Sequence, residues 1–567
     1  MGIFNFWGWF KNNFSGTIHK LGLSQDLETV DINIDNLLID MNGLFHTSAQ
    51  KIYQYGAYKP KDKSIPSIIP NNRLQIKVFE DICKNIENLT LLCKPKKIIL
   101  AIDGPAPYAK IVQQRRRRFS AVVNKEEDDK GFDSNNITPG TKFMDHLSKY
   151  IDWFIRKKIS EDPLWKDIEI IFSNEKVQGE GENKIISYIR NHGNKDESYI
   201  IHGLDADIIM LALGTELKHI YVLRDDLYDK TNKYFVVDIN LVSLQLGEMM
   251  RWKSEIFTYD TKNAISDFIF MCFMIGNDFL SHIPSLEILE GGIDIILNIY
   301  RDIGSLKGHL TKDNEKDITF SKSFLEEFLN SISEYEKNIL ENKLKNRRIY
   351  FPDQILESCV VYIDGEPNLD IKKYREDYTD IHFGKEIKNV CYSYLEGLNW
   401  VINYYKKSCI NWKWYYPYDH APSASVISKY ISSFKIPTYK PSIPLTPFQQ
   451  LLAVLPPKSS SILPVPLNEL LIRDNSPLKE FCPDKFKIDL SGKKYEYQGI
   501  VILPMLDPVI VVNAYLSQIS LVNQYELKRN IFGKSYIYKY DSNVSKVFKS
   551  FYGDINNCKL KTIPIIL

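Results

Sequence analysis

The sequence has almost no net charge. Its 567 residues include 72 lysines and arginines and 71 aspartates and glutamates, so the formal net charge is +1 at pH 7. A protein that binds nucleic acid through its bulk charge carries a clear excess of basic residues. Any nucleic-acid binding by this chain must therefore depend on a local basic patch.

The sequence also lacks paired or regularly spaced cysteines. Its eight cysteines are scattered, with no CxxC pair and no spacing typical of zinc ligands. Disulfide-rich scaffolds and structural zinc sites depend on such patterns. We therefore expect reduced thiols, no disulfide, no structural zinc and a cytoplasmic protein.

Long hydrophobic runs are absent as well. No stretch approaches the roughly 20 apolar residues that a transmembrane helix needs. The aromatic N-terminus, MGIFNFWGWFKNNF, lacks the basic start and the small-residue cleavage site of a signal peptide. The 44% hydrophobic content is enough for one large core or two to three ordinary ones. We expect a globular protein without a membrane span, and we expect it to be a monomer.

Strand-like and helix-like segments alternate between residues 30 and 225. Helices are predicted at 74–92 and 141–159, and strands at 36–40, 96–103, 168–173, 198–203 and 219–224. This alternation predicts a mostly parallel sheet flanked by helices. Thr138, followed by Pro139, resembles a helix start, and the apolar run 267–280 predicts a buried helix that delivers Asp278.

The remaining composition suggests a division into domains. We predict an N-terminal domain at 1–300 and a charged helical connector at 301–350, which is dense in Lys, Glu and Asn. A second mixed α/β region, richer in Tyr, Trp and Pro, is expected at 351–525, packed around the active site. Residues 526–567 are expected to form a C-terminal tail.

Acidic residues stand where several of the predicted strands end. The candidates are Asp40, Asp103, Glu180, Glu182, Asp205, Asp207 and Asp278. The carboxyl ends of parallel strands line the ligand crevice of such a sheet, so these acids should converge. Burying them together without cations would be prohibitive, because like charges and desolvation both oppose ionisation.

This acidic group therefore predicts a metal site. An isolated DxD pair is more often an ordinary solvated turn, but here several pairs and strand ends coincide. Hard divalent cations prefer oxygen ligands, and two Mg²⁺ ions about 3.5 to 4 Å apart suit an in-line phosphodiester displacement. The pattern indicates a nuclease with Mg²⁺ as its cofactor and Mn²⁺ as a possible substitute.

A basic stripe follows Asp103. Its members have helical spacing: Lys110, Gln114, Arg117 and Arg118. On a helix these side chains share one face, whereas Arg115 and Arg116 point away from it. Such a stripe can hold one phosphate group. A nuclear localisation run or a solvated basic face are the alternatives, but closeness to the acidic residue Asp103 favours the phosphate pocket.

Aromatic residues supply a third feature. The segment NWKWYYPYDHAP contains Trp412 and Trp414, and His46 lies six residues after Asp40. Aromatic and imidazole faces stack on unpaired bases with little regard to sequence. A Trp-rich and Tyr-rich segment more often belongs to the core, so both interpretations of these residues remain open on the sequence alone.

These stretches together resemble the Xrn family of 5′→3′ exoribonucleases, which is related to the flap-endonuclease and PIN-like nucleases. The similar stretches run in order over residues 1 to about 505 and include LLIDMNGLFH, AIDGPAPYAKIVQQRRRRF, IIFSNEKVQGEGENKII, IHGLDADIIML, GNDFLSHIPSLEI and NWVINYYKKSCINWKWYYPYDHAP. The chain is similar to a minimal, cytoplasmic-type member of the family.

The resemblance implies an activity and a set of residue roles. It implies hydrolysis of single-stranded, 5′-monophosphorylated RNA to nucleoside 5′-monophosphates in RNA decay, with single-stranded DNA as a further candidate substrate. The acidic residues match the family's metal ligands, and the basic stripe matches its 5′-phosphate pocket. His46 matches the residue that stacks on the terminal base, and either Trp412 or Trp414 matches its aromatic partner. The alternatives are a structure-selective DNA or flap nuclease and an inactive RNA-binding scaffold.

Overall fold

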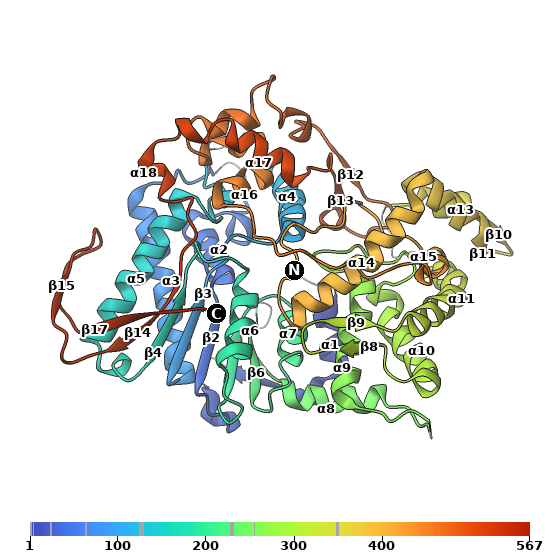
Figure 1. The fold of residues 1–567 in the computed structure, drawn as a ribbon, viewed down its shortest axis with the longest axis horizontal. Coiled ribbons are helices and arrows are strands. Elements are labelled where there is room, and N and C mark those ends of the chain that lie inside the picture. Colours follow the sequence, from blue (N-terminus) through green and yellow to red (C-terminus); the bar gives the residue numbers. More distant parts are fainter. Residues whose placement is uncertain are drawn as a thin grey trace.

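The computed structural model describes the chain except for residues 1–2, 4, 23–24, 63–64, 124–129, 227–231, 255 and 347–350. Within the described residues, the largest sheet has nine strands in the order β1-β7-β6-β5-β2-β3-β4-β14-β17 (Figure 1). These strands are β1 (Ile18–Gly22), β2 (Asn36–Asp40), β3 (Lys97–Ala101), β4 (Glu169–Ser173), β5 (Tyr199–His202), β6 (Ile220–Asp225), β7 (Asn232–Asp238), β14 (Ser535–Tyr540) and β17 (Leu560–Ile565).

The five central strands are parallel, and helices cover both faces of the sheet. Leu38 of β2 lies beside Ile99 of β3 and Ile201 of β5. Successive strand residues face opposite sides, so Leu37 and Ile39 pack in one core while Leu38 packs in the other. The first core includes α2 (Met41–Tyr53), α3 (Asn72–Cys93) and α5 (Lys142–Glu161), and the second includes α1 (Phe6–Asn13), α6 (Gly181–His192), α7 (Ile208–Leu213) and α8 (Ile239–Met250).

The predicted α/β class and its mostly parallel sheet are thus confirmed, but the predicted start of one helix is not. Helix α5 begins at Lys142, and its N-cap is Thr141, whose hydroxyl accepts a hydrogen bond from the Met144 N–H. The predicted start at Thr138 is wrong, because Gly140 between them has a φ of +89°, which no helix accommodates. The Thr138 hydroxyl instead donates to the Asn135 carbonyl.

A helical region lies beside the sheet, to the right in Figure 1. It comprises α9 (Thr261–Cys272), α10 (Gly292–Lys307), α11 (Lys322–Asn346), α12 (Gln354–Ser358), α13 (Ile371–His382), α14 (Ile387–Lys406) and α15 (Ala424–Ile431), with the short hairpins β8 (Thr311–Asp313)–β9 (Ile318–Phe320) and β10 (Val360–Ile363)–β11 (Glu366–Leu369). The predicted helix through 267–280 ends as an α-helix at Cys272 and as a 3₁₀ turn at Ile275, so Asp278 lies in the following loop.

The predicted connector belongs to this region's core. Phe324, Leu325 and Phe328 of α11 are fully buried and pack in the same hydrophobic cluster as α9 and α14. The segment 301–346 is therefore part of a packed helical region, in which even Glu336 is fully buried against Arg375. Residues 347–350 lie outside the described part of the chain.

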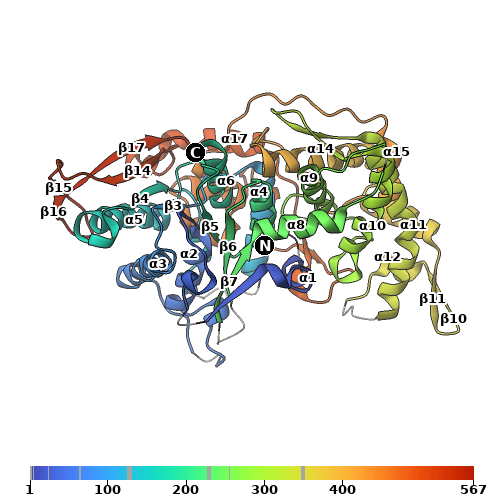
Figure 2. The same cartoon turned by 90° about the horizontal axis from the view of Figure 1, so that it is seen from below.

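The last segments of the chain return to the sheet and to helix α4 (Tyr108–Val123). Helices α16 (Pro447–Val454) and α17 (Pro508–Leu516) form a third core with α4, beside the pair β12 (Lys487–Asp489) and β13 (Ile500–Ile502). Residues 526–567 are not a separate tail, because β14 pairs with β4 and β17 pairs with β14. Figure 2 shows β14 and β17 at the sheet edge with the arm of β15 (Lys546–Phe548) and β16 (Ile555–Cys558) beyond them.

The pattern in β14 explains why this segment is bound. Tyr538 is 3% exposed, and its hydroxyl donates to Asp152 of α5 at 2.6 Å. The Arg156 guanidinium lies over the same ring, with its carbon 5.3 Å from the ring centroid.

Among the described residues, no helix has both the length and the apolar character that crossing a membrane requires.

Candidate active site

The acidic residues meet at the carboxyl edge of the parallel strands. Asp40 is the last residue of β2 and the N-cap of α2, and Asp103 follows β3. Glu180 is the N-cap of α6, which carries Glu182 in its first turn. Asp207 is the N-cap of α7. Each of these acids lies between a strand and the helix that follows it. Asp278 is different, because it lies in the loop after α9 and its 3₁₀ turn.

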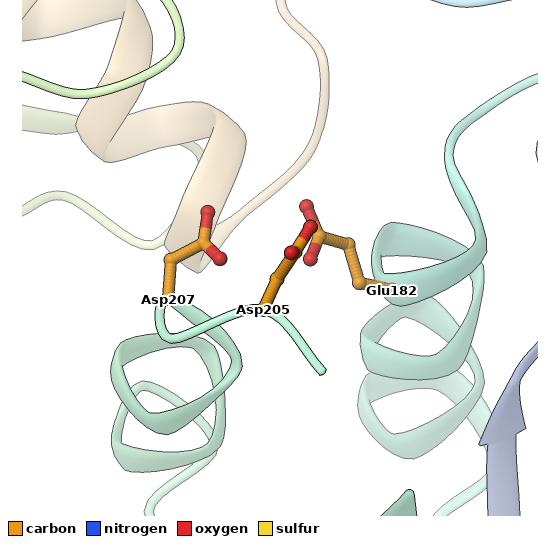
Figure 3. A group of neighbouring side chains, drawn as sticks. All are labelled: Glu182, Asp205 and Asp207. Atoms are coloured by element: carbon orange, nitrogen blue, oxygen red, sulfur yellow. The ribbon is translucent and has the colours of Figure 1, made fainter. Parts of the chain in front are cut away.

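The tightest group consists of Glu182, Asp205 and Asp207. One carboxylate oxygen from each lies within 4.8 Å of the others. Figure 3 shows Glu182 on the first turn of α6 and Asp205 directed toward each other, with Asp207 at the start of α7. Glu182 Oε2 and Asp207 Oδ1 are buried without a hydrogen bond to any described residue.

The pKa shifts of these carboxyl groups are those expected of a site that binds a cation. Burial, followed by the charge of Asp207, raises the pKa of Glu182 well above its ordinary value. Burial, followed by the charges of Asp205 and Asp278, raises the pKa of Asp207 to about 7. Crowded carboxylates with unpartnered oxygens are a donor set that a divalent cation satisfies, because it supplies the missing ligand contacts and removes the repulsion.

A second pair of acids is held by an asparagine. The Asn42 amide donates to Asp103 Oδ2 at 2.8 Å, and the Asp103 N–H donates to Asn42 Oδ1 at 3.0 Å. The backbone N–H of Gly181 donates to Asp103 Oδ1 at 2.7 Å. A Cβ at Gly181 would lie 2.5 Å from Asp40 Oδ1, so only glycine lets this helix start approach the carboxylates.

Lys110 lies among the acids at the start of α4. Its ammonium is 2.5 Å from Glu180 Oε2 and 2.7 Å from Asp278 Oδ2. Burial alone would lower the pKa of Lys110, but the charges of Asp278 and Glu180 outweigh burial and raise the pKa well above its ordinary value. The first residue of the predicted phosphate stripe therefore joins α4 to the acidic group.

The rest of the stripe continues along α4, away from the acids. Gln114 and Arg118 are buried, and Arg118 donates to the Thr138 hydroxyl at 2.5 Å. Arg117 and Asp278 both line a cavity of about 580 Å³. The pKa of His46 is lowered to about 4 by burial and by the charges of Arg117 and Arg118, so His46 lies close to both arginines.

The two arginines predicted to lie off the stripe have partners elsewhere in the protein, although Arg116 lines the same cavity as Arg117. Arg115 is buried, and its guanidinium donates to the carbonyls of Ala453, at 3.1 Å, and Phe481. Arg116 forms an ion pair with Asp419 at 2.7 Å. Arg115 therefore attaches α4 to the third core and is not a surface residue.

The two tryptophans occupy different environments. Trp414 is 7% exposed and stacks on Trp400, with ring centroids 4.8 Å apart and an interplanar angle of 25°. Trp412 is half-buried and lines a cavity of about 420 Å³ together with Gly179 and Tyr404. Trp412 therefore has an accessible face near the loop that carries Glu180.

Several residues of the site carry no signal in the sequence. Asn42 has no pattern that distinguishes it from any polar residue in a first helical turn. Tyr404 and Tyr405 of α14 donate hydroxyl hydrogen bonds to Glu180 and Asp207. These tyrosines fall within a stretch that resembles the Xrn family, and that resemblance is the only signal that could have drawn attention to them.

A PIN-like parallel sheet with carboxylates at its carboxyl edge, next to a basic helix, defines a nuclease whose acidic group can bind metal. Two family profiles match the chain. The profile "XRN 5'-3' exonuclease N-terminus" covers residues 1–226, and "Xrn1 helical domain" covers residues 258–359 and 371–564. The chain belongs to this 5′-3′ exonuclease family. The resemblance seen in the sequence is confirmed.

Curated proteins that are similar to this chain are named as 5′-3′ exoribonucleases. The Drosophila melanogaster "5'-3' exoribonuclease 2 homolog" is 29% identical over 634 residues, which cover 89% of this chain and 68% of that protein. "5'-3' exoribonuclease 1" of Schizosaccharomyces pombe is 28% identical, covering 97% of this chain and 51% of that protein. The Homo sapiens "5'-3' exoribonuclease 1" is 29% identical, covering 97% and 36%. The chain spans about half of the fission-yeast relative and about a third of the human one.

Proposed function

We propose that the chain is a 5′→3′ exoribonuclease that hydrolyses single-stranded RNA from a 5′-monophosphate end and releases nucleoside 5′-monophosphates, with a role in RNA decay. The observation that carries the proposal is the group of Glu182, Asp205 and Asp207, of which Asp207 is buried and the other two are half-buried. Two carboxylate oxygens of this group have no hydrogen bond to a described residue. A divalent cation would supply the missing ligand contacts and reduce the repulsion among these carboxylates.

The proposed metal ligands are the acids that meet at the sheet edge: Asp40, Asp103, Glu180, Glu182, Asp205, Asp207 and Asp278. Two Mg²⁺ ions, or Mn²⁺ in their place, would activate the attacking water and stabilise the leaving oxygen. The chain's own part is to hold these carboxylates in place. Asn42 fixes Asp103, and Lys110 balances the charges of Glu180 and Asp278.

The residues of α4 would select the 5′ end. Lys110, Gln114 and Arg117, together with Arg118, share one face of the helix, and Lys110 touches the acids while Arg118 lies two turns away. A 5′ phosphate bound there would place the following phosphodiester bond toward the carboxylates. Charge-assisted hydrogen bonds favour a monophosphate over a hydroxyl, and a closed pocket of this kind would exclude a cap or triphosphate by size.

His46 and Trp412 are the proposed stacking residues. With a pKa of about 4, His46 is uncharged at neutral pH, so its imidazole face can stack on a base next to the arginines. Trp412 is half-buried and lines a cavity beside the Gly179 loop. Base stacking contributes about 1 to 3 kcal/mol per base with little sequence preference. Trp414 is assigned to the core.

The decisive experiment compares RNA ends with purified protein and Mg²⁺. Nucleoside 5′-monophosphates should accumulate from 5′-monophosphate RNA, while 5′-hydroxyl, triphosphate and circular RNA should resist. Asp207→Asn protein should be inactive on all of them. Equal cleavage of circular RNA would refute the exonuclease proposal, and faster cleavage of flap DNA would favour the DNA-nuclease alternative.

Three further properties stay predictions. Activity on single-stranded DNA is tested by a matched DNA oligonucleotide in the same assay. The monomeric state is tested by light scattering. A cytoplasmic location, expected from the reduced thiols, is tested by imaging the tagged protein in its own cells.

A further inference from the structure

The end of α14 brings two tyrosine hydroxyls to the acidic group. Tyr404 donates to Glu180 Oε1 at 2.6 Å across 224 residues of sequence, and Tyr405 donates to Asp207 Oδ2 at 3.1 Å across 198 residues. Both tyrosines are buried, with 3% and 4% exposure. The helical region therefore reaches into the site through two neighbouring residues of one helix.

These two hydroxyls donate hydrogen bonds to different members of the acidic group. Neighbouring residues of an α-helix point about 100° apart, and the hydroxyls of Tyr404 and Tyr405 accordingly reach two different carboxylates. Tyr405 contacts Asp207, which belongs to the tight group with Glu182, whereas Tyr404 contacts Glu180, which pairs with Lys110. One helix end thus fixes two separate carboxylates.

The tyrosine rings are held by packing. Tyr404 stacks on Trp400 with centroids 4.9 Å apart and an interplanar angle of 17°. Trp400 stacks in turn on Trp414, so the ring whose hydroxyl bonds Glu180 is part of a packed group of three aromatic side chains. The ring of Tyr405 packs edge-on against Phe273 at 5.1 Å. Neither hydroxyl can move without disturbing a packed aromatic group.

We propose that Tyr404 and Tyr405 are positioning residues that hold Glu180 and Asp207 in the orientation in which they bind cations. This inference rests on the proposed metal-dependent function and adds the helical region as the source of that orientation. Partners that orient metal ligands through hydrogen bonds typically account for a 10-fold to 100-fold effect on metal affinity or activity. Without its hydroxyl partner, each carboxylate could leave the ligating orientation.

The test uses Tyr404→Phe and Tyr405→Phe, which remove only a hydroxyl and keep the stacked ring. Mn²⁺ binding to the protein is measured by calorimetry and by the rise in melting temperature that Mn²⁺ causes. Each variant should bind Mn²⁺ about 10-fold to 100-fold more weakly than wild type. Turnover lost at low Mg²⁺ should return at high Mg²⁺, while KM for RNA stays within a factor of three.

The matched control is Tyr300→Phe. Tyr300 is also fully buried and donates to a buried carboxylate, Asp267, at 2.7 Å, but it contacts none of the proposed ligands. Its variant should bind Mn²⁺ as wild type does, whatever its stability. If Tyr404→Phe and Tyr405→Phe also bind Mn²⁺ within threefold of wild type, the positioning role is refuted.

The two proposals fail in distinguishable ways. If wild-type protein binds no Mn²⁺ and cuts no RNA, the proposed function fails, whatever the variants do. If wild type binds Mn²⁺ and the tyrosine variants lose activity that high Mg²⁺ does not restore, the hydroxyls act in some other way and this inference alone is overturned.

Discussion

Replacing Asp207 by Asn should make the metal-free protein more stable while nearly abolishing turnover. The pKa of Asp207 is raised from 3.8 to about 7, first by burial and then by the charges of Asp205 and Asp278. When the pKa of an acid is higher in the folded state than in the unfolded state, its protonation contributes to the free energy of unfolding. This contribution is complete below the pKa of the unfolded state and is lost as the pH rises through the pKa of the folded state. Metal-free wild type should therefore lose stability between about pH 4 and pH 7.

The size of the effect follows from the shift. A change of about 3 pKa units corresponds to about 4 kcal/mol at most. Asn keeps the shape and can still accept the hydrogen bond from Tyr405, but it remains a buried polar group that loses part of this gain. We expect a net stabilisation of about 1 to 3 kcal/mol at pH 8. For a chain of 567 residues, an unfolding entropy of about 2.1 cal/mol/K per residue converts this to a rise of about 1 to 3 °C in melting temperature.

The assay combines melting and turnover. Wild type and Asp207→Asn are melted in EDTA from pH 5 to pH 8, and again with saturating Mg²⁺. The variant should melt higher than wild type in EDTA at pH 8, and the difference should shrink toward pH 5. Added Mg²⁺ should stabilise wild type more than the variant. The reasoning is refuted if the variant melts at a lower temperature than wild type in EDTA at pH 8. It is also refuted if the variant keeps more than about a tenth of wild-type kcat, which corresponds to a barrier change below about 1.4 kcal/mol.

Three further predictions concern the basic helix and the stacking residues. Arg117→Ala should reduce the preference for 5′-monophosphate over 5′-hydroxyl RNA by about 1.5 to 3 kcal/mol, and an unchanged ratio of the two kcat/KM values would contradict the pocket. Arg115→Ala should destabilise the protein by about 2 to 3 kcal/mol, because its guanidinium donates hydrogen bonds to two carbonyls. The preference for 5′-monophosphate RNA should stay unchanged in this variant. If Arg115→Ala instead loses that preference without losing stability, the placement of Arg115 away from the phosphate pocket is wrong. His46→Ala and Trp412→Ala should each weaken RNA binding by about 1 to 3 kcal/mol without a change in melting temperature. Trp414→Ala should instead lower the melting temperature, because it removes a ring from the core. If Trp412→Ala lowers the melting temperature as much as Trp414→Ala does, the stacking role of Trp412 is wrong.

The sequence by itself determined the sheet and its acidic edge. Apolar strand patterns with period 2 and amphipathic helices between them are local signals, so β2 and β3 and the flanking helices could be predicted. Asp40 and Asp103 stand directly at those strand ends. Parallel strands share one carboxyl edge, so the convergence of these acids followed without knowledge of any contact. The helical spacing likewise separated Arg117 from Arg115.

The tertiary structure decided the features that depend on contacts between distant segments. Trp412 and Trp414 have the same local pattern, and only the packing of Trp400 against Trp414 distinguishes them. Residues 526–567 resemble a tail in the sequence, because the local pattern of β14 is a weak indication of a strand. Its place in the sheet is set by antiparallel pairing with β4.

The partners of the acidic group were decided in the same way. Nothing local in the sequence indicates that the ammonium of Lys110 lies between two carboxylates. The hydroxyls of Tyr404 and Tyr405 reach their carboxylates across roughly 200 residues of chain. Periodicity describes which face a residue occupies on its own element, whereas the partner on that face is set by how separate elements pack.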